Sequence, residues 1–317
     1  MQNKKIVILG TGGTIAGLAA DASSNIDYTA AQVGVSQLVG AIPGLGDVVS
    51  EQVAQIDSKD LSFEVWAQLL ERVNHFLLQD DVQGLVIPHG TDTLEETAYF
   101  LHAVLHAHKP VVLTCAMRPA TSLLADGPQN LRDAVAVARH PSSQGVMVVC
   151  AGVVHGAVEV QKIHTYQLNA FGSGDAGPLA YVEEGDVRWI RINALANGDK
   201  GSSAIKYIAK CRDSDAWPAV EIVKSHAGAS GAVVNALVAG GVQGLVAAGT
   251  GNGTVHRDLE AALFAAQARG VRVVRATRCP NGRVLAKVDD AWEDSRGLSP
   301  VKARIALMLD LMAPDLV

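Results

Sequence analysis

Residues 84–96, GLVIPHGTDTLEE, contain the end of one predicted element and the start of another. Gly84–Pro88 is a short apolar run, typical of a strand buried on both faces of a parallel sheet. From about residue 94 to 105, apolar residues recur at helical spacing, which predicts an amphipathic helix. We therefore interpret His89–Thr93 as a strand-to-helix turn at the carboxyl end of a strand.

The same alternation of strand and helix extends in both directions along the chain. It predicts strands at residues 4–9, 84–88, 110–115 and 146–150, and helices at 61–78, 94–105 and 130–139. A second series has strands at 219–223, 245–248 and 271–276 and helices at 231–238, 259–268 and 300–312. Such alternation predicts βαβ units. The expected fold class is α/β, with a doubly wound, mostly parallel sheet in the N-terminal domain and a smaller α/β C-terminal domain.

A polar stretch separates the two series. Residues 193–217 are rich in Asn, Gly, Asp, Ser and Lys and show little periodicity. A chain of 317 residues also favours about two domains. We therefore predict an N-terminal domain at 1–195 that carries the chemistry, a linker at 196–217 and a C-terminal domain at 218–317.

Composition and charge exclude several classes of protein. The net charge is −6 and basic residues are not clustered, so a nucleic-acid partner is not expected. No apolar stretch approaches the length of a membrane span. Cys115, Cys150, Cys211 and Cys279 form no Cys-x-x-Cys pair and are predicted to be buried, reduced thiols. The expected location is the cytoplasm, because no signal peptide is visible either.

The turn after the first predicted strand is the first candidate site. Gly10–Gly17 reads GTGGTIAG. A dinucleotide loop is one interpretation, but Ile15 occupies the place of the third glycine and no helix is predicted next. A purely structural turn is a second interpretation, because glycines are common in tight turns. It leaves unexplained the threonines on either side of Gly-Gly, and a threonine hydroxyl is a weak nucleophile without a nearby base or cation.

The turn at His89–Thr93 is the second candidate site. Helix capping alone would explain one Thr or Asp there, since Thr91, Asp92 or Thr93 could cap the next helix. It does not require the whole string His-Gly-Thr-Asp-Thr. No Cys and His residues have the spacing of a metal site.

Together the two turns resemble the signature motifs of the bacterial-type L-asparaginases, closest to the type II pattern. This family also contains the glutaminase-asparaginases. The resemblance extends over nearly the whole chain. It continues at residues 109–112, 116–122, 125–131, 249–253 and 298–304.

The resemblance implies roles for individual residues. Thr14 matches the nucleophile and Tyr28 the tyrosine beside it. Thr91, Asp92 and Lys162 match a Thr-Asp-Lys triad in which lysine activates the threonine. The matching substrate-binding positions are Ser58, its neighbour Lys59, Asp92, Ala116 and Asn252, the last lent by a neighbouring subunit. Backbone N–H groups near Thr91 and Ala116 are candidate oxyanion donors.

Two lysines depart from the family pattern. Lys59 follows Ser58 where members usually carry Gln or Glu, which accepts a hydrogen bond from the substrate ammonium. Lys287 aligns with a glutamate lent by the neighbouring subunit, and Asp289, Asp290 or Glu293 remain candidates to replace that glutamate. One hypothesis is weakened recognition of the α-amino group, with des-amino amides better tolerated. The alternative is a Lys59 side chain that points to solvent.

The expected activity is L-asparagine amidohydrolase, in asparagine catabolism, with a threonine nucleophile and no cofactor or metal. A dual glutaminase-asparaginase or an amidase for another small amide is the nearest alternative. From a different class, an inactive amino-acid-binding regulator remains open. The resemblance also implies a homotetramer, a dimer of dimers.

Overall fold

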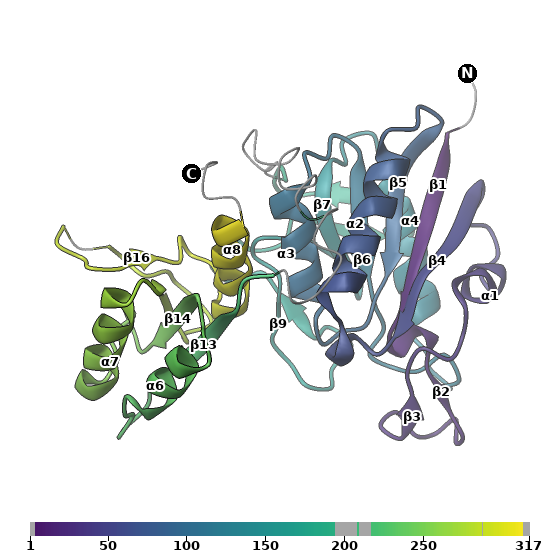
Figure 1. The fold of residues 1–317 in the computed structure, drawn as a ribbon. Helices are drawn as coiled ribbons and strands as arrows, with labels where there is room; N and C mark the ends of the chain where they lie inside the picture. Colours follow the sequence, from purple (N-terminus) through teal and green to yellow (C-terminus); the bar gives the residue numbers. More distant parts are fainter. Residues whose placement is uncertain (1–3, 194–207, 209–216, 287, 313–317) are drawn as a thin grey trace. The chain divides into compact units, whose positions relative to one another are not determined.

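The computed structural model describes residues 4–193, 208, 217–286 and 288–312 (Figure 1). The chain divides into two compact units, Met1–Arg212 and Asp213–Val317. Both are α/β, and the first contains the larger, mostly parallel sheet, so the predicted fold class is confirmed. The predicted linker, 196–217, lies outside the described residues except for Ile208 and Trp217.

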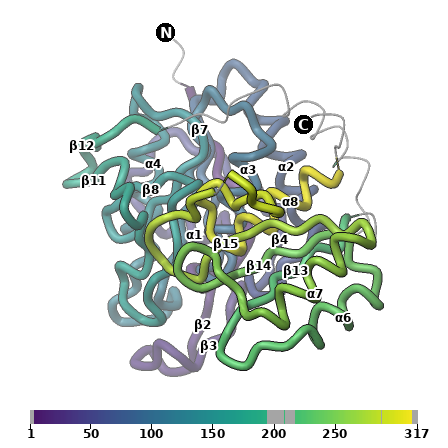
Figure 2. Tube along the Cα trace, turned by 90° about the vertical axis from the view of Figure 1, so that its left-hand side faces the viewer, coloured from purple at the N-terminus to yellow at the C-terminus, as the bar shows by residue number. Residues whose placement is uncertain are grey.

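The first unit is built on an eight-stranded sheet. In spatial order its strands are β12 (Asp186–Trp189), β11 (Ala180–Glu183), β8 (Val153–Gly156), β7 (Gly145–Cys150), β6 (Pro110–Thr114), β5 (Val82–Pro88), β1 (Lys5–Gly12) and β4 (Val48–Ile56). The strands from β7 to β4 are parallel, whereas β8, β11 and β12 pair antiparallel at the other edge. Figure 2 shows these three strands together. Edge strand β4 was not predicted, because it is half-buried and interrupted by polar residues.

Helices cover both faces of this sheet, as a doubly wound fold requires. Helices α2 (Phe63–Leu77) and α3 (Leu94–Val104) cover one face, and α1 (Val35–Gly40) and α4 (Gly127–Arg139) cover the other (Figure 1). Between α2 and α3, Trp66 stacks on Phe100 with ring centroids 4.7 Å apart. Ile6 and Ile8 of β1 belong to the opposite core, with α1 and α4.

The second unit has a four-stranded parallel sheet in the order β13 (Val220–Lys224), β14 (Gly244–Gly249), β15 (Arg272–Thr277) and β16 (Glu293–Asp294). Helices α6 (Ala232–Ala239) and α7 (Arg257–Ala268) pack on one face and α8 (Pro300–Met312) on the other (Figure 1). The predicted closing helix, 300–312, is therefore confirmed. In the described parts of both units, no helix has the length and apolar character needed to cross a membrane.

The prediction of four buried thiols is only partly correct. Cys115 and Cys150 are buried, with their sulfur atoms 3.8 Å apart at the ends of β6 and β7. Cys279 is exposed, because it lies in an irregular segment beyond β15. Cys211 lies outside the described residues.

The strand order explains where a site can form in the first unit. Strand β1 lies between β4, the next strand of the sheet along the chain, and β5, the strand after that. The chain therefore leaves β1 in one direction and returns on its other side. In open α/β sheets such a switch point leaves a crevice at the carboxyl ends of the strands. Both candidate turns, after β1 and after β5, follow these ends.

Candidate active site

The turn after β1 places Thr14 at the carboxyl edge of the sheet. Gly12 and Gly13 have φ angles of 104° and 83°, which residues with a β-carbon rarely adopt. The short helix η1 (Thr14–Ala16) follows, and then strand β2 (Leu18–Ala19). No α-helix begins there to meet a pyrophosphate with its N-terminus, so the dinucleotide interpretation has no structural support.

The two signature turns are in direct contact through their glycines. A β-carbon placed on Gly13 would overlap the backbone of Gly90. A β-carbon placed on Gly90 would in turn overlap the side chain of Ser58 and lie 3.1 Å from the Gly13 Cα. The segments that follow β1, β4 and β5 therefore meet at this point. Their close packing requires glycine at both position 13 and position 90.

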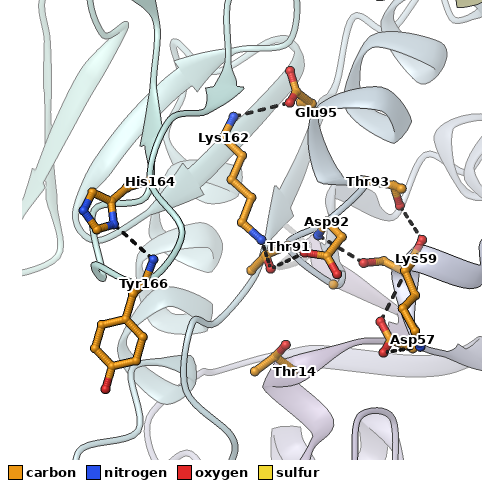
Figure 3. Close-up of polar contacts among 12 residues, drawn as sticks. Thr14, Asp57, Lys59, Thr91, Asp92, Thr93, Glu95, Lys162, His164 and Tyr166 are labelled. Atoms are coloured by element: carbon orange, nitrogen blue, oxygen red, sulfur yellow. Dashed lines mark hydrogen bonds and ion pairs between the residues drawn. The ribbon is translucent and has the colours of Figure 1, made fainter. Parts of the chain in front are cut away.

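Lys162 contacts two polar residues of the second turn, Thr91 and Asp92 (Figure 3). Its Nζ donates to Thr91 Oγ1 at 2.8 Å and to Asp92 Oδ1 at 2.6 Å. Thr91 Oγ1 lies 3.5 Å from Asp92 Oδ1. The Thr91 residue is 7% exposed and the Lys162 side chain 22% exposed, so the contact is partly shielded from solvent. The structure thus brings together the three residues that the resemblance groups as a triad.

A short hairpin carries Lys162 to this position. Strand β9 (Gln161–Lys162) pairs antiparallel with β10 (Phe171–Gly172). The Lys162 backbone N–H also lies 3.4 Å from Glu95 Oε1, in the first turn of α3. Sequence reasoning did not find this contact, because a glutamate in the first turn of a helix is already explained by the helix dipole.

Tyr28 contacts Thr14 directly. Its hydroxyl lies 2.8 Å from Thr14 Oγ1, so one of the two oxygens donates to the other. Tyr28 begins strand β3 (Tyr28–Thr29), which pairs with β2 in a hairpin that projects from the first unit (Figures 1 and 2). The structure thus brings together the two hydroxyls that the resemblance places side by side.

Ser58 lies in the short helix η2 (Ser58–Asp60) and is 3% exposed. Its hydroxyl accepts from the Asp92 N–H at 3.2 Å, and its carbonyl accepts from Thr93 Oγ1 at 2.9 Å. Thr93 is the N-cap of α3, but its side chain caps no helical N–H. The capping explanation of the turn is therefore wrong for Thr93, whose hydroxyl connects α3 to Ser58 instead.

Lys59 has two carboxylate partners on its own turn. Its Nζ lies 2.9 Å from Asp57 Oδ2 and 3.0 Å from Asp60 Oδ2, and its side chain is 60% exposed. The hydrogen bonds to these carboxylates raise the pKa of the Lys59 ammonium, so it stays charged. Figure 3 shows Lys59 turned toward Asp57.

His89 is fully buried beneath the second turn. Gly90 O can only accept, so the His89 Nδ1, 2.8 Å away, must carry the proton. Neutral His89 then accepts at Nε2 from the Thr97 hydroxyl at 3.0 Å, and Thr97 accepts from Trp66 Nε1 at 2.9 Å. Burial lowers the His89 pKa to about 4, which keeps the ring neutral. His89 therefore stabilises the second turn through its hydrogen bond to Gly90 O.

Several of the candidate residues belong to the second unit. Asn252 follows β14, and its side-chain amide exchanges two hydrogen bonds with the Leu285 backbone, at 3.0 and 2.6 Å. Asp290 forms an ion pair with Arg275, and Glu293 with Arg272. Lys287 lies outside the described residues.

Two backbone N–H groups at this edge have no acceptor in the part of the chain that the structure describes. Ala116 is fully buried and follows the end of β6, and Thr91 follows the end of β5. Among the residues that the structure describes, neither the Thr91 N–H nor the Ala116 N–H makes a hydrogen bond. Backbone donors without a protein acceptor at the ends of neighbouring strands are suited to a developing oxyanion.

Known proteins share this architecture. The family described as "Asparaginase, N-terminal" matches residues 5–194, and "Glutaminase/Asparaginase C-terminal domain" matches 219–315. L-asparaginase 2 of Escherichia coli (strain K12) is 41% identical, covering 96% of this chain and 88% of its own. The glutaminase-asparaginase of Pseudomonas fluorescens biotype A is 38% identical, covering 96% and 86%.

A solved structure agrees with these matches. The crystal structure of a probable cytoplasmic L-asparaginase from Campylobacter jejuni has a TM-score of 0.89 and 36% identity, covering 97% of this chain and 95% of its own. Fold and site thus define a hydrolase of the class that acts on carboxamides. The chain belongs to the asparaginase family, and the predicted resemblance is confirmed.

Proposed function

We propose that the chain hydrolyses L-asparagine to aspartate and ammonia through a threonine nucleophile. The observation that carries the proposal is the contact of Lys162 Nζ with both Thr91 Oγ1 and Asp92 Oδ1, at 2.8 and 2.6 Å. An amine held against a hydroxyl and a carboxylate is an arrangement that can move a proton. The family and the named L-asparaginases support asparagine as the substrate.

Thr14 takes the role of the nucleophile. Its Oγ1 attacks the side-chain amide carbon, its proton reaches the leaving nitrogen, and ammonia departs from an acyl-enzyme. Water then adds to the ester, aspartate leaves and the Thr14 hydroxyl is restored. Tyr28 orients Thr14 through the 2.8 Å contact, and Thr91, activated by Lys162, directs the water of the second step. The Thr91 and Ala116 N–H groups receive the oxyanion in both steps.

Polar groups beside Thr14 bind the rest of the substrate. Asp92 exposes 51% of its side chain and takes the α-amino group, while Ser58 binds the α-carboxylate. Asn252 of a neighbouring subunit completes the site in a homotetramer, a dimer of dimers. The expected location is the cytoplasm, which the name of the Campylobacter jejuni protein supports.

Glutaminase activity is the second candidate function. The named glutaminase-asparaginase, 38% identical, favours it. An inactive amino-acid-binding regulator is less well supported, because a binder has no need of Lys162 against a hydroxyl.

Ammonia release from asparagine, glutamine and succinamate tests the proposal. Thr14→Ala should abolish release, and Lys162→Met should lower kcat at least about a hundredfold, since general base catalysis contributes that much or more. Lys5→Met is the matched control. Lys5 also forms an ion pair, with Asp81 at 2.8 Å, and is 25% exposed, so its loss should leave kcat unchanged. Full activity of Thr14→Ala would rule out the nucleophile, and no release from any amide would favour the regulator.

A further inference from the structure

The Thr91 and Ala116 N–H groups follow adjacent strands of the sheet. Strands β5 and β6 are parallel neighbours with Pro88 opposite Thr114. The His89 N–H donates to Thr114 O at 2.8 Å, which keeps the pairing in register beyond the end of β5. Thr91 and Ala116 therefore leave the sheet next to each other.

Each of these N–H groups belongs to a peptide unit whose carbonyl is held by a buried side chain. His89 Nδ1 donates to Gly90 O at 2.8 Å, and Asn130 Nδ2 donates to Cys115 O at 2.9 Å. A trans peptide unit is planar, and its C=O and N–H point in opposite directions. Fixing the carbonyl therefore fixes the direction of the N–H of the next residue.

Asn130 is held so that its amide has one orientation. It lies in the first turn of α4 and is 2% exposed. Its Oδ1 accepts from the Ala151 N–H at 2.9 Å, so its Nδ2 faces the other way, toward Cys115 O. Nδ2 also lies 3.2 Å from Asp126 Oδ2.

Asp126 extends the same support along the turn after β6. Its carboxylate accepts from the N–H groups of Met117 and Arg118, both at 3.0 Å. Asn130 and Asp126 thus bind the backbone on both sides of Ala116 and leave the Ala116 N–H without an acceptor in the described chain. In the motif ADGPQNL, residues 125–131, the Asp and the Asn thus bind the backbone of the turn after β6.

We propose that Asn130 is a positioning residue for amide hydrolysis: it holds Cys115 O and thereby aims the Ala116 N–H at the oxyanion. The inference rests on the proposed function, because it needs an oxyanion to form at Thr14. Hydrogen bonding at a peptide carbonyl also polarises the peptide unit and strengthens its N–H as a donor.

The role predicts a specific kinetic pattern. The charge on the substrate oxygen develops in the transition state, so a misaimed N–H lowers kcat and leaves substrate binding nearly unchanged. For Asn130→Ala we expect kcat to fall about tenfold to a hundredfold, with KM and the inhibition constant of aspartate within about twofold of wild type.

Ser143→Ala is the matched control. Ser143 is 6% exposed and donates to Val137 O at 2.6 Å, near the carboxyl end of α4 and away from the site. Its loss also removes one buried side-chain-to-carbonyl hydrogen bond, and kcat should stay within about twofold of wild type. In each protein kcat is calculated per aspartate-binding site. An unfolded fraction of the sample then does not lower the measured kcat.

Asn130→Asp is a second variant that tests the same role if Asn130→Ala does not fold. Its carboxylate still accepts from the Ala151 N–H but gives Cys115 O no donor until it is protonated. We expect a low kcat at neutral pH that recovers, relative to wild type, as the pH falls.

Other outcomes would overturn the inference. A wild-type kcat in either variant shows that Asn130 does not aim the donor. A parallel loss of kcat and aspartate binding shows a general structural role. Thr14→Ala separates these results from the proposed function, because activity in that variant removes the Thr14 mechanism itself, whatever Asn130 does.

Discussion

Gly13 and Gly90, from the two signature turns, pack backbone against backbone with no room for a side chain on either. This contact sets the spacing between the turn that carries Thr14 and the turn that carries Thr91 and Asp92. Ser58 closes the group, because its side chain occupies the space that a β-carbon of Gly90 would need. The spacing of Thr14, the proposed nucleophile, from Thr91 and Asp92 therefore depends on the absence of side chains at Gly13 and Gly90.

Gly13→Ala should disable the enzyme. The new methyl group meets the Gly90 backbone, and φ is 83°, so positive-φ strain and overpacking together should cost about 3 kcal/mol. Gly44→Ala measures the free-energy cost of positive φ alone, since φ is 78° there but open space surrounds the position. It should cost about 1 kcal/mol and leave kcat unchanged. Urea unfolding and kcat measure both effects, and equal costs for the two variants would contradict the packing argument.

Tyr28→Phe should lower kcat with little effect on folding. It removes the hydroxyl that lies 2.8 Å from Thr14 Oγ1 and keeps the ring, so we expect a loss of about tenfold to a hundredfold. Tyr181→Phe serves as control, because the Tyr181 ring packs against Arg188 in the first unit without reaching Thr14. Steady-state kinetics with asparagine give the comparison. An unchanged kcat in Tyr28→Phe would show that Thr14 is oriented by other groups.

Lys59→Gln should change the preference between asparagine and succinamate by less than about threefold. The Lys59 ammonium is already bound by Asp57 and Asp60, and exposed ion pairs contribute little free energy. Measuring kcat/KM for the two amides in wild type and variant tests this. A tenfold gain for asparagine would instead show that Lys59 reaches the substrate and weakens recognition of its α-amino group.

The stability of the first unit should depend on His89 at mildly acidic pH. The His89 pKa is about 4 in the folded chain and 6.5 as its ordinary value, because burial disfavours the charged ring. Below pH 6.5 the unfolded state therefore binds a proton that the folded state does not. The contribution of His89 to stability is complete above pH 6.5 and is lost as the pH falls toward 4, by about 3 kcal/mol in all.

His89→Gln separates this effect from the titration of carboxylates. Between pH 7 and pH 5 the free energy of unfolding of wild type should fall by about 2 kcal/mol more than that of the variant. Urea titrations at the two pH values measure the difference. Parallel losses in both proteins would mean that His89 is solvated or charged in the folded state.

From the sequence we predicted four of the parallel strands of the first unit, helices between them and the two turns of the candidate site. Strands such as β1 and β5 are continuous apolar runs, and helices such as α8 show clear periodicity, because both are buried on defined faces. Strand β4 was not predicted, because it is a half-exposed edge strand in which apolar and polar residues are mixed. Family resemblance assigned Thr14, Tyr28, Thr91, Asp92 and Lys162, and the structure places all five at one edge of the sheet.

The supporting contacts could not be predicted in the same way. Thr93 looked like a helix cap, yet its hydroxyl bonds Ser58, 35 residues earlier. Asn130 looked like an ordinary polar residue at the start of a helix, yet its amide holds Cys115 O. Each of these side chains has a satisfactory local explanation, so nothing in the sequence pattern singles out its partner.

By itself, then, the sequence determined the fold class and the residue types of the site, because periodicity and signature turns are local properties of the chain. Only the tertiary structure decided how these residues are aimed. The Lys162 ammonium reaches Thr91 across 71 residues, and Lys59 turns to Asp57 and Asp60. Such choices depend on which strand ends become neighbours and which polar groups burial leaves without water, and both are settled only when the sheet is assembled.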